Sequence, residues 1–209
     1  MTYSVKECYL TLQGEGAQTG RAAVFLRFTG CNLWTGREQD REKAVCKFCD
    51  TDFVGMDGPG GGQFRTAEAL VEHVTGYWPG GGRPYVICTG GEPLLQLDTL
   101  LIEAFHARGF EVGVETNGTI EAPEGLDWIC VGPKSTAPLR QRSGHELKLV
   151  FPQLDARPED FADLDFGAFF LQPMDGPEKE SATAATIDYC RRHPQWRLSL
   201  QTHKLIGIP

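Results

Sequence analysis

Residues 30–51 read Gly-Cys-Asn-Leu-Trp-Thr-Gly-Arg-Glu-Gln-Asp-Arg-Glu-Lys-Ala-Val-Cys-Lys-Phe-Cys-Asp-Thr, and the rest of the chain is organised around them. Three of the seven cysteines fall here, with the spacing Cys31-x14-Cys46-x2-Cys49. Thiolates three residues apart converge on one metal or cluster when the backbone turns between them. Bound to a cube of four irons, three thiolates leave one iron open for another molecule, which is a catalytic arrangement. The spacing is equally typical of a zinc site made of three cysteines and one histidine.

Two features of this stretch favour an iron–sulfur cluster over zinc. Phe48 places an aromatic face beside Cys49, where a flat heterocycle can stack, and residues 30–51 contain no histidine. The stretch resembles the cluster loop of radical S-adenosylmethionine (radical SAM) enzymes, which is usually Cys-x3-Cys-x-aromatic-Cys. The second spacing matches, whereas an insertion at residues 32–45 lengthens the first. Because loop-closure cost grows slowly with length, the thiols can still converge, and the polar insertion predicts a short surface helix.

Length and composition bound the class of protein. The 209 residues allow a single domain (1–209) with an ample core, and a net charge of −8 argues against nucleic acid as a partner. The N-terminal residues show no signal-peptide pattern, and no apolar run approaches the roughly 20 residues of a membrane helix. We therefore expect a cytoplasmic protein with no membrane partner. The cysteines outside the cluster loop have apolar neighbours and are expected to pack in the core: Cys8, Cys88, Cys130 and Cys190.

Strands and helices alternate along the chain. Strands are predicted at residues 5–12, 23–28, 85–88, 111–115, 128–131, 147–151, 169–172 and 196–200. Long helices are predicted at residues 66–77, 98–108 and 179–192. The glycine-rich residues 55–63 predict a flexible connection. Such alternation is typical of a mostly parallel sheet covered by helices.

The predicted fold class is α/β, with too few helices for a complete barrel. Eight βα units need about 250 residues, and the segments after Glu115 and Val131 are too short for a crossover helix. We expect a partial, splayed (β/α) barrel of about six mostly parallel strands and about three long helices. In such a barrel the loops that follow the strands carry the chemistry.

Polar residues follow the predicted strands in a systematic way. They are Arg27, Gly90-Gly91-Glu92, Glu115-Thr116-Asn117, Pro133-Lys134-Ser135, Gln172-Pro173-Met174-Asp175 and Gln201-Thr202-His203-Lys204. A cap or turn would explain any one of them, whereas all of them on one face predict a site. Gly90-Gly91-Glu92 resembles the Gly-Gly-Glu of radical SAM enzymes, which grips the amino group of the cofactor's methionine. The chemistry fits, because two glycines allow close approach and a carboxylate binds an ammonium.

Further motifs resemble one family of that superfamily, the 7-carboxy-7-deazaguanine synthases of queuosine and 7-deazapurine biosynthesis. They are Leu12-Gln13-Gly14-Glu15-Gly16, Arg27 with Thr29-Gly30-Cys31-Asn32-Leu33, Cys49-Asp50-Thr51 and Gln201-Thr202-His203-Lys204. The resemblance implies conversion of 6-carboxy-5,6,7,8-tetrahydropterin to 7-carboxy-7-deazaguanine, with ring contraction and loss of ammonia. It also implies a [4Fe-4S] cluster, S-adenosylmethionine and Mg²⁺, a modified radical SAM core, an electron donor such as flavodoxin, and a homodimer.

The resemblance also implies a set of site residues, with no catalytic residue beyond the cluster and cofactor. The predicted cluster ligands are Cys31, Cys46 and Cys49, and the predicted magnesium ligand is Thr51. The predicted S-adenosylmethionine contacts are Phe48, Cys49, Asp50, Gly91, Glu92, Pro133, Lys134, Ser135, Gln172, Pro173, Met174 and Asp175. The predicted substrate contacts are Leu12, Gln13, Gly14, Glu15, Arg27, Gly90 and His203. Arg27 offers the substrate carboxylate a bidentate fork.

Several alternatives stay open at this point. A radical activating enzyme that acts on a glycine of a partner protein is similarly short, although it would normally show Cys-x3-Cys. A non-catalytic zinc or iron–sulfur binding protein is the alternative of a different class. Thr51 would also serve as a helix N-cap, and His203 as a core or surface histidine.

Overall fold

The predicted strands join into one open sheet in the computed structural model, which describes residues 2–209. The strands are β1 (Tyr3–Leu12), β2 (Ala22–Phe28), β3 (Gly62–Phe64), β4 (Tyr85–Gly90), β5 (Glu111–Thr116), β6 (Trp128–Val131), β7 (Ser143–Phe151), β8 (Asp165–Pro173) and β9 (Trp196–Leu198). Their order in the sheet is β3-β1-β2-β4-β5-β6-β7-β8-β9. The strands from β2 to β9 in this order are all parallel, and β1 and β3 extend one edge in antiparallel pairing.

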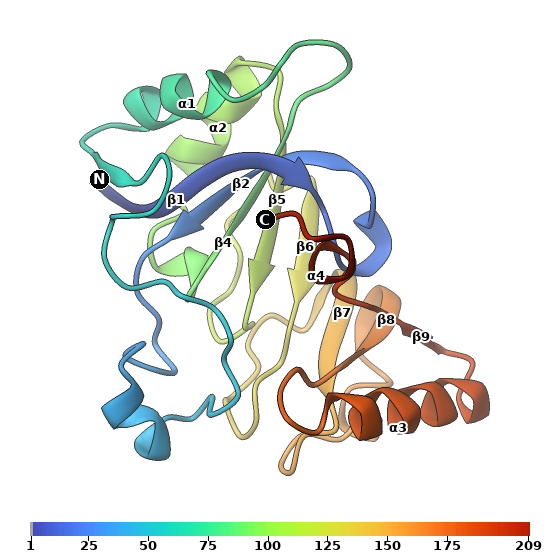
Figure 1. Ribbon diagram of the computed structural model, residues 1–209. Helices are drawn as coiled ribbons and strands as arrows, with labels where there is room; N and C mark the ends of the chain where they lie inside the picture. Colours follow the sequence, from blue (N-terminus) through green and yellow to red (C-terminus); the bar gives the residue numbers. More distant parts are fainter. Residues whose placement is uncertain (1) are drawn as a thin grey trace.

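Three helices lie where the sequence predicts long helices, and a short fourth helix was not predicted. They are α1 (Ala67–Thr75), α2 (Thr99–Ala107), α3 (Lys179–Arg192) and the short C-terminal α4 (Thr202–Ile206). Thr66 caps α1 by accepting from the N–H of Ala69 at 3.2 Å, and Asp98 caps α2 by accepting from that of Leu101 at 3.0 Å. In Figure 1, α1 and α2 lie together beside one end of the sheet and α3 lies at the other end.

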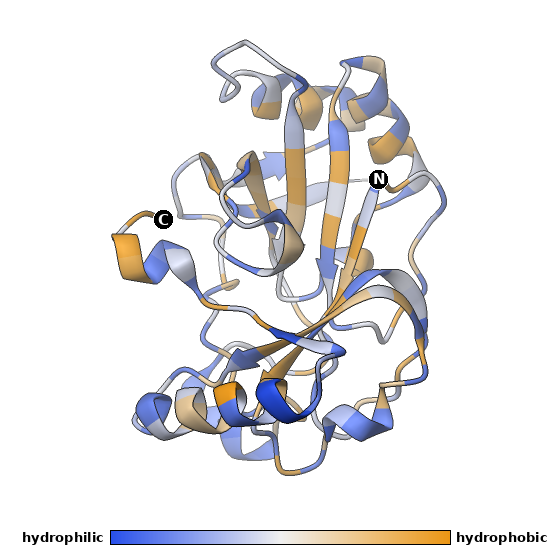
Figure 2. Ribbon diagram, turned by 90° about the vertical axis from the view of Figure 1, so that its right-hand side faces the viewer, coloured by the Kyte–Doolittle hydropathy of each residue, from blue (hydrophilic) through white to orange (hydrophobic). Residues whose placement is uncertain are grey.

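Two apolar clusters hold these layers together. The larger joins β1, β2, β4 and β5 to α1 and α2, and the second joins β6 to β9 with α3. The hydropathy colouring of Figure 2 shows apolar residues concentrated in the strands and on the helix faces turned toward them. Cys8, Cys88 and Cys130 are buried as predicted, whereas Cys190 is only half-buried at the edge of the second cluster.

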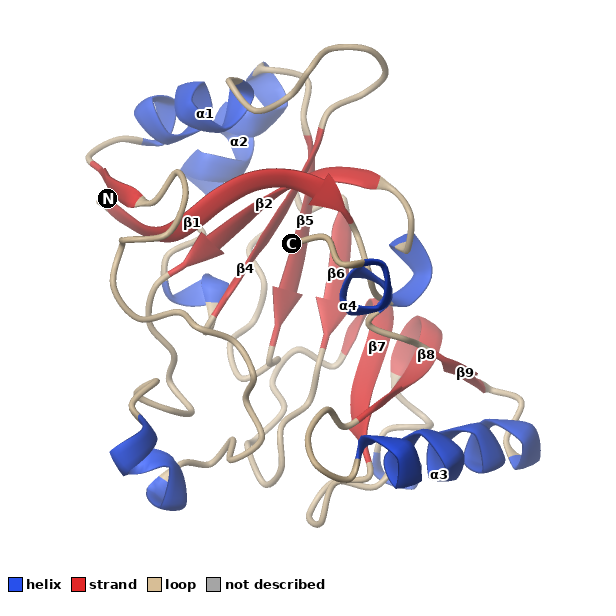
Figure 3. Ribbon diagram, viewed as in Figure 1, coloured by secondary structure: helices blue, strands red, loops and turns tan. Residues whose placement is uncertain are grey.

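The α/β prediction is confirmed: the sheet is mostly parallel and open, and few helices cover it. Residues 117–127 and 132–142 contain no helix, so β5, β6 and β7 follow one another without crossover helices. Long loops instead gather at the edge toward which the parallel strands point (Figure 3). That edge is where the polar residues after the strands were expected to meet.

The prediction of a flexible connection at residues 55–63 is wrong. The N–H of Cys8 donates to the carbonyl of Pro59 at 2.8 Å, and β3 pairs with β1. A side chain at Gly61 would clash with the carbonyl of Lys6. The glycines therefore allow this segment to lie directly on β1, a long-range contact that composition does not reveal.

Among residues 2–209, none of the helices combines the length and the apolar character needed to cross a bilayer.

Candidate active site

The inserted residues 32–45 of the cluster loop form a surface loop whose two ends lie side by side. The N–H of Val45 donates to the carbonyl of Leu33 at 3.1 Å, so the two ends of the insertion meet. Between them, residues Glu38–Lys43 form a 3-10 helix, which confirms the predicted surface helix in a tighter form. Because the insertion closes on itself, the fourteen-residue spacing does not hold Cys31 and Cys46 apart.

The three thiols of the loop suit a cluster ligand set. All are free, and the sulfur of Cys31 accepts from the N–H of Leu33 at 3.4 Å. A hydrogen bond between the thiols of Cys46 and Cys49 lowers the pKa of Cys49 to about 6 and raises that of Cys46. No three His, Cys, Asp or Glu side chains within residues 2–209 are gathered to hold one metal ion. A four-iron cube takes each thiolate on a separate iron, and three free thiols from one loop have the donor chemistry that this group needs.

Gly90 ends β4, and Gly91 after it lies against the start of the cluster loop. The N–H of Glu92 donates to the carbonyl of Gly30 at 2.9 Å. A side chain at Gly91 would clash with the same carbonyl, and Gly90 has a positive φ of 136°. Gly91 therefore approaches the cluster loop closely and fixes it beside the end of β4, whereas Gly90 approaches the backbone of Phe28 in β2.

The carboxylate of Glu92 is fully buried behind these glycines. It accepts from the N–H of Leu94 at 3.0 Å, from the hydroxyl of Thr116 at 2.8 Å and from the N–H of Asn117 at 2.8 Å. Burial raises its pKa despite these donors. In the protein alone, Glu92 thus joins the loops after β4 and β5, and its contact with the cofactor's ammonium stays a prediction.

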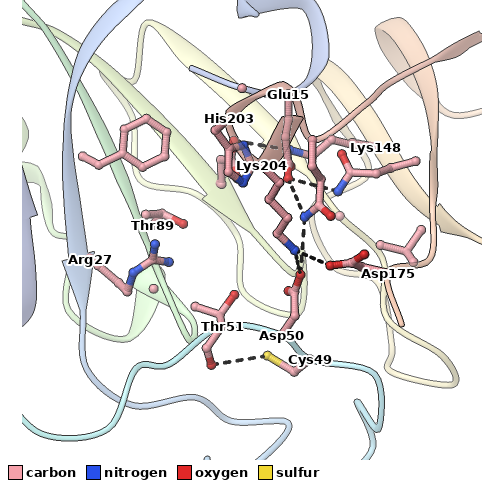
Figure 4. Close-up of a pocket in the computed structure, with 18 of the residues that line it drawn as sticks. Glu15, Arg27, Cys49, Asp50, Thr51, Thr89, Lys148, Asp175, His203 and Lys204 are labelled. Carbon is pink, nitrogen blue, oxygen red and sulfur yellow. Dashed lines mark hydrogen bonds and ion pairs between the residues drawn. The ribbon is translucent and has the colours of Figure 1, made fainter. Parts of the chain in front are cut away.

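A cavity of about 420 Å³ lies on one face of the sheet, beside Cys49 (Figure 4). The predicted site residues that line it are Leu12, Gln13, Gly14, Glu15, Arg27, Phe48, Cys49, Asp50, Thr51, Gly90, Gly91, Lys134, Gln172, Pro173, Met174, Asp175 and His203. Those that do not are Cys31, Cys46, Glu92, Pro133 and Ser135. All the predicted substrate contacts therefore meet around one space, although they come from segments far apart in the sequence.

Ser135 lies in a turn that faces a neighbouring loop. Its φ of 45° is unusual for a residue other than glycine. Its N–H donates to the side chain of Gln153 at 2.9 Å, and its hydroxyl donates to Asp155 at 3.3 Å. The amide of Gln153 also donates to the carbonyl of Pro133 at 3.3 Å. Residues 133–135 are thus held from outside the cavity, and Lys134 alone among them lines it.

Lys148 is a charged cavity residue that sequence reasoning missed. Its buried ammonium lies 2.5 Å from Glu15 and 3.3 Å from Glu115. Burial alone would lower the pKa of Lys148 and raise that of Glu15. Their mutual attraction outweighs it, so the pKa of Lys148 lies well above its usual value and that of Glu15 falls to about 2. The missed signal is the alternation in β7, where Glu146, Lys148 and Val150 share one face.

Amides complete this charged cluster. The side chains of Gln172 and Gln201 each donate to Oε1 of Glu15 at 3.1 Å. Gln13 donates to Glu115 at 2.8 Å, and its own oxygen accepts from the N–H of Glu15 at 3.1 Å. The nitrogen and the oxygen of the Gln13 amide are therefore both hydrogen-bonded, so this side chain holds the carboxylate of Glu115 and the backbone of Glu15.

Arg27 is held at the opposite side of the cavity from Lys148 (Figure 4). Its Nε donates to Glu7 at 2.7 Å, and one terminal nitrogen donates weakly to the hydroxyl of Tyr9 at 3.4 Å. The ring of Tyr9 in turn stacks on Phe25. One edge of the guanidinium is thus fixed by Glu7, and Arg27 remains a wall of the cavity.

Thr51 also lines the cavity, two residues after Cys49. No helix begins within residues 50–58, so the alternative role of Thr51 as a helix N-cap is excluded. His203 packs against Gly14 so closely that a side chain at Gly14 would clash with the imidazole. It lies in the cavity wall, neither in the core nor free on the surface.

The C-terminal segment ties the loops around the cavity together. The N–H of Thr202 donates to the carbonyl of Gly14 at 2.9 Å. The ammonium of Lys204 lies 2.7 Å from Asp50 in the cluster loop and 2.6 Å from Asp175 after β8. Figure 4 shows Lys204 between these two carboxylates. Three predicted site segments are therefore joined by α4, which the sequence did not predict.

Comparison with known proteins gives one consistent family. Residues 41–148 match the model of the Radical SAM superfamily. The chain is 66% identical over 210 residues to a 7-carboxy-7-deazaguanine synthase of Caulobacter vibrioides and 64% identical over 212 residues to one of Bordetella pertussis, with 100% of both chains covered in each case. It also resembles the crystal structure of QueE from Escherichia coli, with a TM-score of 0.74, 28% identity, and coverage of 97% of this chain and 95% of that one.

Proposed function

This chain belongs to the 7-carboxy-7-deazaguanine synthase family of radical SAM enzymes, and we propose that its substrate is 6-carboxy-5,6,7,8-tetrahydropterin. Membership makes the chain an enzyme of queuosine biosynthesis that uses a [4Fe-4S] cluster and S-adenosylmethionine. The product is 7-carboxy-7-deazaguanine, formed with ring contraction and loss of ammonia. The alternatives of an activating enzyme and a non-catalytic metal-binding protein have no observation in their favour.

The observation that carries this proposal is the division of charge in the cavity. Arg27 supplies a cation at one side, held through Nε by Glu7 at 2.7 Å. Glu15 and Glu115 supply carboxylate oxygens at the other side, around Lys148. A substrate with a carboxylate at one end and N–H donors on a pterin edge at the other complements this arrangement.

The residues of the chain would bind and orient this substrate. Arg27 receives its carboxylate, while the pterin edge lies toward Gln13, Glu15 and the backbone of Leu12 and Gly14. Cys31, Cys46 and Cys49 would hold the cluster, which together with S-adenosylmethionine supplies a hydrogen-abstracting 5′-deoxyadenosyl radical when bound. The cavity wall around Phe48, Gly91, Lys134 and the Gln172–Asp175 loop would hold the nucleoside and exclude water.

We further propose that Thr51 contributes to a magnesium site. One hydroxyl is a weak ligand for this ion, so substrate oxygens and waters complete its octahedral shell and the ion binds with the substrate. Thr51→Ala is expected to weaken the stimulation of product formation by Mg²⁺ without changing S-adenosylmethionine affinity. Identical magnesium curves for wild type and variant would contradict this assignment. An electron donor such as flavodoxin, a homodimer and a cytoplasmic location also stay proposals.

The proposed function is tested by identifying products. The anaerobically reconstituted enzyme is incubated with 6-carboxytetrahydropterin, Mg²⁺, S-adenosylmethionine and a reductant. The products are then separated by chromatography and identified by mass spectrometry. We expect 7-carboxy-7-deazaguanine and released ammonia in equal amounts. Cleavage of S-adenosylmethionine with the pterin recovered unchanged would show that the substrate is wrong while the cofactor chemistry is intact.

A further inference from the structure

The insertion in the cluster loop is anchored to the protein by a buried aromatic pair. Trp34 is 8% exposed, and its ring packs edge-on against Phe53 with centroids 5.7 Å apart. Its indole N–H donates to the carbonyl of Arg37 at 3.2 Å. Phe53 follows the cluster loop in sequence, so the insertion packs onto the segment that comes directly after the loop. In Figure 1 the insertion forms the blue excursion at the lower left.

One side chain of the insertion reaches the turn between Cys46 and Cys49. The guanidinium of Arg41 lies over the ring of Trp34, 4.1 Å from its centroid. One of its nitrogens donates to the carbonyl of Lys47 at 2.9 Å and to that of Cys49 at 3.1 Å. Its Nε pairs with Glu38 at 2.6 Å, which fixes the plane of the group. A single cation is thus held rigidly between two carbonyls of the turn.

We propose that Arg41 is a positioning residue for the cluster, which holds the turn between Cys46 and Cys49 in its ligand-binding form and places a positive charge beside it. The proposal rests on the cluster of the proposed function and not on its substrate. Two carbonyls that point at one cation are held together, and without the cation they repel each other. A reduced cluster carries one more negative charge than an oxidised one, so a nearby cation favours reduction.

The test uses the variants Arg41→Gln and Arg41→Lys, with Arg37→Gln as a matched control. Arg37 lies in the same insertion, and its side chain makes no hydrogen bond or ion pair within residues 2–209. Iron release from the loaded proteins to a ferrous chelator is followed without oxygen, and the cluster's midpoint potential is measured by a redox titration read by electron paramagnetic resonance. We expect Arg41→Gln to release iron about tenfold faster, the size of one charge-assisted hydrogen bond. Its midpoint potential is expected to be more negative.

The conservative variant separates positioning from charge. Lysine keeps the positive charge but lacks the planar fork, so Arg41→Lys should return the potential toward that of wild type and restore iron retention only in part. Arg37→Gln should match wild type in both measurements. Loss of fold stability alone would leave the potential of the loaded protein unchanged, so a faster iron release with an unshifted potential would overturn the electrostatic part of the proposal.

A second measurement needs no cluster. Hydrogen–deuterium exchange of the apo-proteins compares a peptide over residues 46–51 with peptides over the central strands. We expect faster exchange in residues 46–51 of Arg41→Gln than of wild type, with the strands unchanged. Equal exchange in residues 46–51 would overturn the positioning role. Neither measurement uses the pterin, so failure of the proposed substrate in the product assay would leave these results standing.

Discussion

Lys148 balances the charge of the cavity, and its removal should destabilise the fold. Lys148→Met leaves the partly buried carboxylates of Glu15 and Glu115 without their shared cation. Breaking a fully buried pair costs about 3–5 kcal/mol, so this partly buried cluster should lose somewhat less than that, which denaturant unfolding at pH 7 would show as a lower free energy of unfolding. Lys179→Met is the control, because its pair with Asp175 is partly exposed and is worth about 0–1 kcal/mol. Equal losses in the two variants would contradict the role of Lys148.

Glu15 should make the stability of the protein fall in acid. Its pKa is about 2 in the folded protein and roughly 4.3 in an unfolded chain. The unfolded chain therefore binds the proton first, so the stabilisation is complete above about pH 4.3 and is lost as the pH falls toward 2. Unfolding free energies measured over this range should fall less steeply for Glu15→Gln. Asp175, whose pKa is also lowered to about 2 by Lys204 and Lys179, keeps its share of the slope in both proteins.

Site residues that belong to a sequence motif could be predicted. Site residues that only the folded chain brings to the cavity could not. Arg27 and Thr51 were expected in the site from their places beside the cysteine motif, and both line the cavity. Lys148 alternates with apolar residues in β7, as Glu146 does on the same face, but the two carboxylates beside Lys148 come from residues 15 and 115, which no local pattern places there. For Glu92 the motif could be recognised from the sequence, but the burial of its carboxylate could not. That burial depends on hydrogen bonds from Thr116 and Asn117 at the end of β5.

At the scale of elements, Asp98 should matter more than an ordinary helix cap. Its Oδ1 accepts from the N–H of Leu101 and also from the hydroxyl of Tyr3 in β1, at 2.8 Å. Asp98→Ala should lower the free energy of unfolding by about 2 kcal/mol, the sum of a cap and one neutral hydrogen bond. Thr66→Ala removes the cap of α1 alone and should cost about 1 kcal/mol. Chemical denaturation of both variants gives the comparison, and equal losses would mean that the bond to Tyr3 contributes nothing.

Elements with local signals were predicted well, and elements made by distant pairing were not. The predicted cap at Thr66 marked the beginning of α1, and the helix expected from about residue 98 begins there as α2, capped by Asp98, because capping involves neighbouring residues. The strand β3 was missed, since its pairing with β1 joins residues about sixty positions apart. The glycines of residues 55–63 were read as flexible for the same reason. The short α4 likewise depends on contacts with Gly14 rather than on its own sequence.

At the scale of the whole molecule, the site exists because the sheet brings distant segments together. Residues from the N-terminal strands, the cluster loop, the loops after β4 and β8 and the C-terminal segment line one cavity. Alternating strands and helices predicted that their polar ends would share an edge. The sequence could not show how the loops are joined there, because Lys204 links Asp50 and Asp175 only in the folded chain.

The central claim is that this cavity binds 6-carboxytetrahydropterin with its carboxylate on Arg27. Arg27→Lys keeps a positive charge beside Glu7 but loses the two-donor fork of the guanidinium. Equilibrium binding of the pterin and of S-adenosylmethionine is measured by calorimetry on the cluster-loaded wild type and variant, with Mg²⁺ present. We expect pterin affinity to fall about tenfold or more, which is the worth of one charge-assisted hydrogen bond, while S-adenosylmethionine affinity stays unchanged. Unchanged pterin affinity in the variant would contradict the central claim.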